Sequence, residues 1–291
     1  MEMGRAGFRA AYLDSGNHGG TYLNFTPECS AESGGGVGYI HGNQRMLANM
    51  KEAVRKVAPD FCFTAESFWE GNIAHLDEYL VCNTTNAYLE GDRVTAIPMA
   101  QTVYHDYTVM YSVWPSRYDV ERDNALGYVA KFGLAFCWGV KPGWNILNLL
   151  YKYQNHEIAL ATSLARYDAY WKAKKFLVYG RMLRLPEIQT TQGLIPVKWH
   201  KSYSANYMHV LLPAVLGSVW EAPDGKKALV LYNITEKPDQ SVVSLKGNLE
   251  NSLSGVSRVS SVFPDDVAIK DATVTLTLPP RVPIIMELEE K

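Results

Sequence analysis

The stretch Gly7-Phe8-Arg9-Ala10-Ala11-Tyr12-Leu13-Asp14 is a short apolar run that ends in a carboxylate. A polar, glycine-rich segment, residues 15–38, follows it directly. The apolar run predicts a buried strand and the polar segment predicts the loop after it. Because parallel strands of one sheet end at a common edge, we expect Asp14 to stand at that edge.

The same pattern occurs twice more along the chain. Residues 60–65 form an apolar run that ends at Glu66, and residues 97–104 form one that ends at His105-Asp106. Between the first two runs, apolar residues recur at three- and four-residue spacing over 38–57, which predicts a helix. This alternation predicts βαβ units whose strand-end acids, Asp14, Glu66 and Asp106, share one edge.

The rest of the amino-terminal half continues this rhythm. We expect a strand over 79–82, a helix over 122–131, a strand over 132–138 and a long amphipathic segment over 153–179. Five strand units correspond to about strands 4–8 of a (β/α)8 TIM barrel, which needs eight. The first three strands would come from another polypeptide, or the chain is the carboxy-terminal fragment of a longer protein. We favour the fragment, because half a barrel leaves strand edges unpaired.

From about residue 185 the helical spacing gives way to short β-rich runs. Turn signals such as Pro223-Asp224-Gly225 separate these runs and predict hairpins. The predicted fold class is therefore α/β with two domains, a partial TIM barrel over 1–184 and a small all-β sandwich over 185–291.

Composition limits the classes of function. The 291 residues are 47% hydrophobic, 20% charged and 12% aromatic, as in an ordinary globular enzyme with a sizeable core. A formal net charge of −2 argues against a nucleic-acid partner. No run of about 18 apolar residues predicts a membrane span. Residues 1–6 lack a signal-peptide pattern, and the localisation of a longer parent, whether secreted or periplasmic, stays open.

Several of these residues occur in an order that resembles a known group of proteins. The set comprises Tyr12-Leu13-Asp14, Cys29, Gly34-Gly35-Gly36, Ala65-Glu66-Ser67 with Glu70, and Val103-Tyr104-His105-Asp106-Tyr107. It is similar to the pattern of uncharacterised bacterial glycoside-hydrolase-like barrels, related to the α-amylase and α-galactosidase type of retaining glycosidase. The resemblance covers roughly residues 6–180.

This resemblance implies a function and roles for individual residues. Asp14 would be the nucleophile and Glu66 the general acid/base, with His105 and Asp106 contacting the substrate, an oligo- or polysaccharide. Tyr12 stands where that group usually has an arginine. Among the additional substrate contacts we expect His18 in the glycine-rich loop and the aromatic side chains of Tyr12, Trp69 and Trp138, which suit stacking on sugar rings. No cofactor is implied.

Each of these assignments has a structural alternative. Glu66 could instead cap a helix, and the tryptophans could pack in the core. A metal-assisted hydrolase would use Asp14, His18, His41 and His105, but the sequence has no HxH or HExxH pair. Four cysteines without CxxC spacing also predict no zinc site. A non-catalytic glycan-binding protein or an inactive barrel fragment is the main alternative to a glycosidase.

Overall fold

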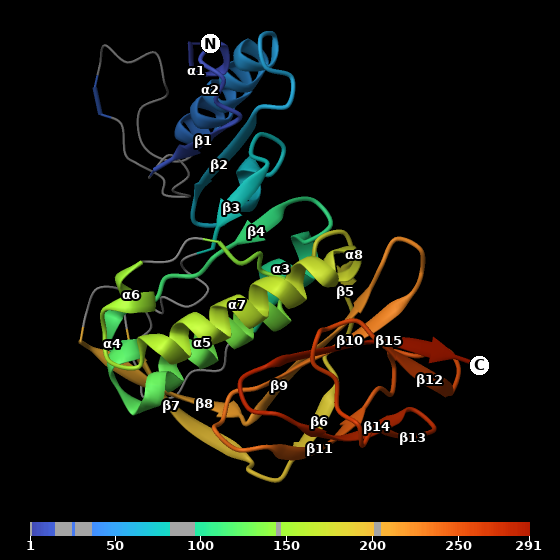
Figure 1. Ribbon diagram of the computed structural model, residues 1–291. Coiled ribbons are helices and arrows are strands. Elements are labelled where there is room, and N and C mark those ends of the chain that lie inside the picture. The colour runs from blue at the N-terminus through green and yellow to red at the C-terminus, as the bar shows by residue number, and fades with distance from the viewer. Residues whose placement is uncertain (1, 15–24, 27–36, 82–96, 144–146, 201–204) are drawn as a thin grey trace. The chain divides into compact units, whose positions relative to one another are not determined.

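The computed structural model describes residues 2–14, 25–26, 37–81, 97–143, 147–200 and 205–291 (Figure 1). The chain divides into two compact units. The first unit comprises Met1–Cys82 with Tyr107–Met110, and the second comprises Asn83–Asp106 with Tyr111–Lys291. The expected domain boundary after residue 184 lies within the second unit.

The first unit is a small α/β structure. Its elements are α1 (Glu2–Arg5), β1 (Ala10–Leu13), α2 (Val37–Arg55), β2 (Cys62–Glu66), a 3-10 helix (Glu70–Asn72), β3 (Glu78–Leu80) and the start of β4 (Val109–Tyr111). The strands form one sheet in the order β1-β2-β3-β4, and β1, β2 and β3 are mutually parallel. The predicted helix over 38–57 and the predicted strand before Glu66 are confirmed.

The core of the first unit lies between α2 and one face of the sheet. Leu47 and Val54 are buried on α2, seven residues apart and so on one helical face. Phe63, Ala65 and Tyr79 are buried on the strands, and they occupy alternate or paired positions of β2 and β3. Period-2 alternation therefore directs the remaining strand side chains to the opposite face of the sheet.

The second unit combines helices with antiparallel sheets. Its helices are α3 (Met99–Tyr104), α4 (Arg117–Glu121), a 3-10 helix (Asp123–Ala125), α5 (Leu126–Cys137), α6 (Asn148–Tyr151), α7 (His156–Lys172) and α8 (Lys174–Leu177). Its strands are β5 (Arg181–Met182), β6 (Glu187–Thr190), β7 (Leu194–His200), β8 (Tyr207–Pro213), β9 (Val215–Glu221), β10 (Lys227–Asn233), β11 (Asp239–Ser244), β12 (Leu253–Arg258), β13 (Ala268–Lys270), β14 (Thr273–Leu278) and β15 (Pro283–Glu290).

Two sheets of the second unit share one apolar core. One has the order β12-β15-β10-β9-β5 and the other β13-β14-β11-β6. Inward side chains from both sheets, such as Leu229, Met286, Val243 and Leu276, form a single buried cluster. The turn between β9 and β10 contains Gly225 with a φ of +80°, as the Pro-Asp-Gly signal predicts.

Helices α5 and α7 run side by side in Figure 1, and α5 also packs against β9 and β10. A Cβ at Gly133 would lie 2.5 Å from the ring of Tyr232, so this glycine allows α5 to approach β10 closely. All residues from Gly127 to Cys137 are buried.

Two predicted barrel strands are wrong. Residues 132–138 belong to α5 and its carboxyl-terminal cap. The prediction failed because a short apolar segment that is buried on all sides shows no periodicity, so a helix and a strand cannot be told apart there. Residues 99–104 form α3, which begins after Pro98, and the strand of this region is β4 further along. In the described part of the chain, the sheet that contains the parallel strands β1, β2 and β3 therefore has four strands, and not the five that were predicted.

Candidate functional site

The carboxyl ends of β1 and β2 bring two of the predicted acids together. The strands pair in parallel with Tyr12 beside Thr64 and Leu13 beside Ala65. Asp14 and Glu66 are the next residues on each chain. Neighbouring strands lie about 4.8 Å apart, so two acids at adjacent positions can hold their carboxyl groups about 5–5.5 Å apart, as a retaining glycosidase requires.

Glu66 lies on the sheet face opposite the core of the first unit, and Asp14 directly follows the last residue of β1. Tyr12 and Thr64 pair across β1 and β2, and Glu66 follows Thr64 by two residues within β2, so alternation gives these three side chains the same side. Asp14 is exposed and Glu66 is half-buried. Tyr12 is 44% exposed on this face, which leaves its ring accessible to a ligand.

A third carboxylate on this face was not predicted. Glu78 pairs with Thr64 across β2 and β3, two residue pairs before the pairing ends at Glu66 and Leu80, and is half-buried. The carboxylate of Glu78 acts on the thiol of Cys62. Partial desolvation raises the pKa of the Cys62 thiol, and the carboxylates of Asp77 and Glu78 raise it further. Glu78 directly precedes the apolar run Tyr79-Leu80-Val81, and no alternation of polar and apolar residues marks it as part of the strand.

The chain after Glu66 is held by main-chain contacts. Ser67 has a φ of +64°, a left-handed conformation that costs a non-glycine residue about 1–3 kcal/mol. Its N–H donates to the carbonyl of Leu80 at 2.9 Å and so ties the end of β2 to the end of β3. The ring of Phe68 then packs edge-on against Tyr79 at 5.2 Å. Strain that is held in place this way is common beside functional groups.

Trp69 and the following 3-10 helix are also anchored. The carbonyl of Trp69 accepts from the Tyr79 hydroxyl at 3.4 Å, and its half-buried indole covers Gly71, where a Cβ would lie 2.5 Å from the ring. The side chain of Gln44 on α2 donates to the carbonyl of Gly71 at 2.6 Å. The segment that carries Trp69 is therefore fixed to the helix of its own unit.

The structure contradicts two of the predicted substrate contacts. His105 is 6% exposed, its Nδ1 lies 2.9 Å from the carbonyl of Gly180 and its Nε2 lies 3.1 Å from that of Leu177. Its ring packs edge-on against Trp220, and burial lowers its pKa. Trp138 is 4% exposed and packs in the core of the second unit. Neither side chain is accessible to a sugar.

The remaining predicted positions differ in what the structure says of them. Asp106 is exposed in the second unit, but it follows the helix α3, so the strand-end argument that grouped it with Asp14 and Glu66 is wrong. His18 lies outside the described residues. Among the described residues, no group of three or more His, Cys, Asp or Glu side chains could hold a metal ion. No helix in the described part of the chain is long and apolar enough to cross a bilayer.

A buried charged cluster in the second unit was also missed. Asp119 and Lys131 are both fully buried, with Lys131 Nζ 2.7 Å from Asp119 Oδ2. Asp119 Oδ1 lies 3.1 Å from His200 Nδ1, and Asp119 completes the capping box of α4 with Ser116. Burial opposes the charge on Asp119, but Lys131 and the hydrogen bonds outweigh it and lower its pKa. For Lys131 burial has the larger effect, and because it disfavours the charged ammonium it lowers the pKa. The cluster joins α4, α5 and β7, so we interpret its role as structural.

Comparison with known proteins gives one sequence family and several coarse structural similarities. A family described as a domain of unknown function (DUF6259) matches residues 3–114, less than half of the chain. This match includes β1, β2 and both strand-end acids. No curated protein sequence matches the chain.

Among solved structures, a noncanonic maltogenic alpha-amylase from Thermotoga neapolitana is 12% identical, with a TM-score of 0.48 over 85% of this chain and 59% of the amylase. An alpha-amylase from Geobacillus thermoleovorans, complexed with acarbose, is 10% identical, with a TM-score of 0.49 over 85% of this chain and 57% of the enzyme. Alpha-galactosidase I from Mortierella vinacea is 10% identical, with a TM-score of 0.45 over 96% of this chain and 68% of the enzyme. The chain spans less than two thirds of the length of either amylase.

Proposed function

We propose that the chain carries the carboxylate pair of a retaining O-glycosidase that acts on an α-linked glycan, with Asp14 as nucleophile and Glu66 as general acid/base. The observation that supports this most is the parallel, in-register pairing of β1 and β2 up to Leu13 and Ala65. Asp14 and Glu66 are the next residues after this last pair, at neighbouring strand ends, which supports their proposed action on one sugar.

In this mechanism Asp14, ionised, attacks the anomeric carbon while Glu66 transfers its proton to the departing oxygen. Glu66 then accepts a proton from the water that hydrolyses the glycosyl–Asp14 ester, which restores both groups. The anchored turn at Ser67 supports the proposal, because a general acid must keep its position through both steps. Tyr12 and Trp69 are the proposed stacking surfaces for the sugar rings.

Leaving-group dependence tests the role of Glu66. The assay uses phenyl and 2,4-dinitrophenyl α-D-glucopyranosides and α-D-galactopyranosides with the 291-residue chain. Glu66→Gln should lower turnover of the phenyl glycosides about 10²–10⁴-fold, the usual contribution of general acid catalysis. Hydrolysis of the dinitrophenyl glycosides should lose far less in its first step, because that leaving group needs no proton.

Asp60→Asn is the matched control. Asp60 is an exposed acid that precedes β2 at the opposite end of the strand, so its loss should leave turnover unchanged. Equal losses for good and poor leaving groups in Glu66→Gln would remove Glu66 as the acid. Glycan binding without turnover by the unaltered chain would instead support a non-catalytic binding protein.

A further inference from the structure

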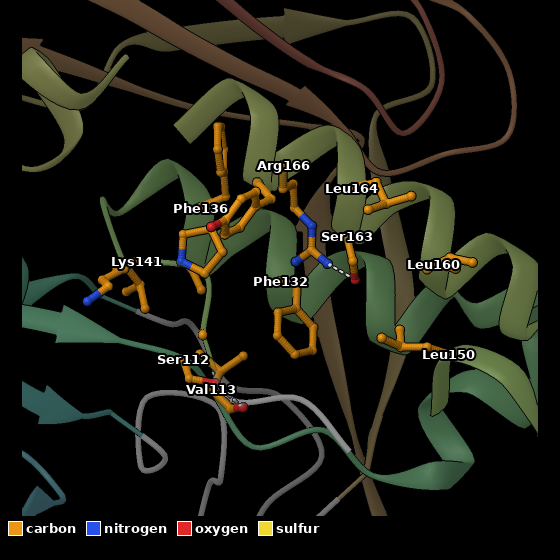
Figure 2. Close-up of a pocket in the computed structure, with 15 residues that line it drawn as sticks. Ser112, Val113, Phe132, Phe136, Lys141, Leu150, Leu160, Ser163, Leu164 and Arg166 are labelled. Carbon is orange, nitrogen blue, oxygen red and sulfur yellow. Dashed lines mark hydrogen bonds between the residues drawn. The ribbon is translucent and has the colours of Figure 1, made fainter. Parts of the chain in front are cut away.

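A cavity of about 290 Å³ lies within the second unit, between α5, α6, α7 and the segments that follow β4 and α5 (Figure 2). Its walls are mainly apolar, and they include Phe132, Phe136, Leu150, Leu160 and Leu164. None of the lining residues is an aspartate or a glutamate, whereas Arg166 and Lys141 both line it. The cavity is therefore an apolar site with the guanidinium of Arg166 at its wall.

Arg166 is the unusual member of this wall. It comes from α7 and is only 4% exposed. Its Nε donates to the carbonyl of Thr162 at 3.0 Å, and its Nη2 donates to Ser163 Oγ at 3.2 Å. Figure 2 shows the guanidinium directed between Ser163 and Phe132, with its carbon 4.5 Å from the centre of the Phe132 ring.

The described residues supply no carboxylate to Arg166. A guanidinium has five N–H donors, and among the described residues Arg166 has two hydrogen-bond acceptors, the carbonyl of Thr162 and Ser163 Oγ. Burying a charge without an opposite charge is costly, and the contacts of Arg166 with the rings of Phe132 and Tyr128 offset this cost only in part. The remaining N–H groups are thus suited to a ligand with an anionic, two-oxygen head group.

Arg166 is not needed to join α5 to α7 by hydrogen bonding. Both of its hydrogen bonds remain within α7, since Thr162 and Ser163 precede it on the same helix. The hydrogen bond between the helices is made by the Tyr128 hydroxyl and Ser163 Oγ at 2.7 Å. A structural role therefore accounts for Ser163, whose hydroxyl joins the two helices, but the hydrogen bonds of Arg166 do not account for its buried charge.

We propose that this cavity binds an organic carboxylate with an apolar body, with Arg166 contacting the carboxylate and the Phe132, Phe136, Leu160 and Leu164 side chains surrounding the body. The volume fits this class of ligand. An engineered cavity of about 150 Å³ takes benzene, so the cavity here, at about 290 Å³, has room for one ring or a medium alkyl chain together with its carboxylate.

Calorimetric titration of the 291-residue chain tests the proposal with three probes. They are 3-phenylpropionate, octanoate and the neutral 3-phenylpropionamide. At least one acid should bind with a dissociation constant of about 1 mM or lower, as expected for a ligand of roughly ten heavy atoms. The two acids distinguish an aryl from an alkyl body. The amide should bind at least about tenfold more weakly than 3-phenylpropionate if that acid binds, because it lacks the charge that Arg166 would pair with.

Variants then locate the site. Arg166→Gln should weaken binding of the acid about 10- to 100-fold and leave the amide unchanged. Lys172→Gln is the matched control, because Lys172 is a cation of the same helix outside the cavity and should bind the acid normally. If Arg166→Gln does not fold, Ala135→Leu serves instead, since Ala135 lines the cavity and the larger side chain would fill it.

Three results would overturn the proposal. They are equal affinity for 3-phenylpropionate and its amide, no binding of either acid at several millimolar, or unchanged acid affinity in a folded Arg166→Gln or Ala135→Leu variant. The readout concerns binding to the second unit alone, so it is independent of whether Asp14 and Glu66 are catalytic.

Discussion

Replacing Lys131 by methionine should strongly destabilise the second unit. Lys131 is 0% exposed, and its ammonium donates to Asp119 Oδ2 at 2.7 Å and to the carbonyl of His200 at 2.6 Å. Methionine keeps much of the volume but removes the charge and both donors. Asp119 would then be a buried carboxylate that has lost its cation, a change that costs about 3–5 kcal/mol.

The assay is urea unfolding followed by tryptophan fluorescence, because the Trp199 ring lies 5.5 Å from Lys131 Nζ and reports on this region. Lys172→Met on α7 is the control. Lys172 and Asp168 form an ion pair whose side chains are 47% and 46% exposed, and a pair of this kind contributes about 0.3–0.5 kcal/mol. The double variant Asp119→Asn with Lys131→Met should lose less than the sum of the single losses, since the two residues act as one unit.

The pH dependence gives the same reasoning a second test. The pKa of Asp119 is lowered in the fold, so its stabilisation is present above its unfolded pKa and is lost as the pH falls through the folded value. The stability difference between the unaltered chain and Asp119→Asn should therefore shrink in acid. A loss in Lys131→Met no larger than that in Lys172→Met would refute the cluster as a stabilising element.

Two further predictions concern the first unit. Gly42→Ala should stabilise the first unit by about 0.5–1 kcal/mol, since Gly42 is an exposed residue inside α2 with no atom within 4 Å of an added Cβ. Hydrogen exchange of the α2 amides measures the gain, and unchanged or faster exchange would contradict it. The raised pKa of Cys62 predicts slow alkylation by iodoacetamide at neutral pH and a rate that rises with pH into the alkaline range. Glu78→Gln should move that profile to lower pH, whereas an unmoved profile would show that Glu78 does not act on the thiol.

Local sequence patterns predicted the parts of the fold that have one buried and one solvated face. The helix α2 shows its apolar stripe because only Leu47, Val54 and their neighbours face the core. In α5 every residue from Gly127 to Cys137 is buried, so its sequence carries no stripe. The helix predicted over 122–131 covers its first half, whereas its second half, within the predicted strand 132–138, was interpreted as a strand. The six residues of α3 are too few for a helical period to show.

In the candidate site, too, positions that depend on local sequence could be predicted, and those that depend on long-range contacts could not. The position of Asp14 and Glu66 at the ends of two strands could be predicted because each follows an apolar run directly, and β1 and β2 do pair up to Leu13 and Ala65. The catalytic roles of the two acids stay a prediction. The burial of His105 could not be predicted, since its contacts with Leu177 and Gly180 join residues more than 70 positions apart. The same holds for Asp119 and His200, which are 81 positions apart. Such contacts depend on the assembled fold and leave no local signal.

Covalent trapping tests the pairing of Asp14 with Glu66 most directly. The 291-residue chain is incubated with 5-fluoro-α-D-glucosyl fluoride or 5-fluoro-α-D-galactosyl fluoride, and the adduct is located by intact-mass analysis and peptide mapping. A single glycosyl group on Asp14 that forms in the unaltered chain and persists longer in Glu66→Gln is the expected result. An adduct on another acid, or no adduct with either sugar in a chain that hydrolyses the matching aryl glycoside, would contradict it.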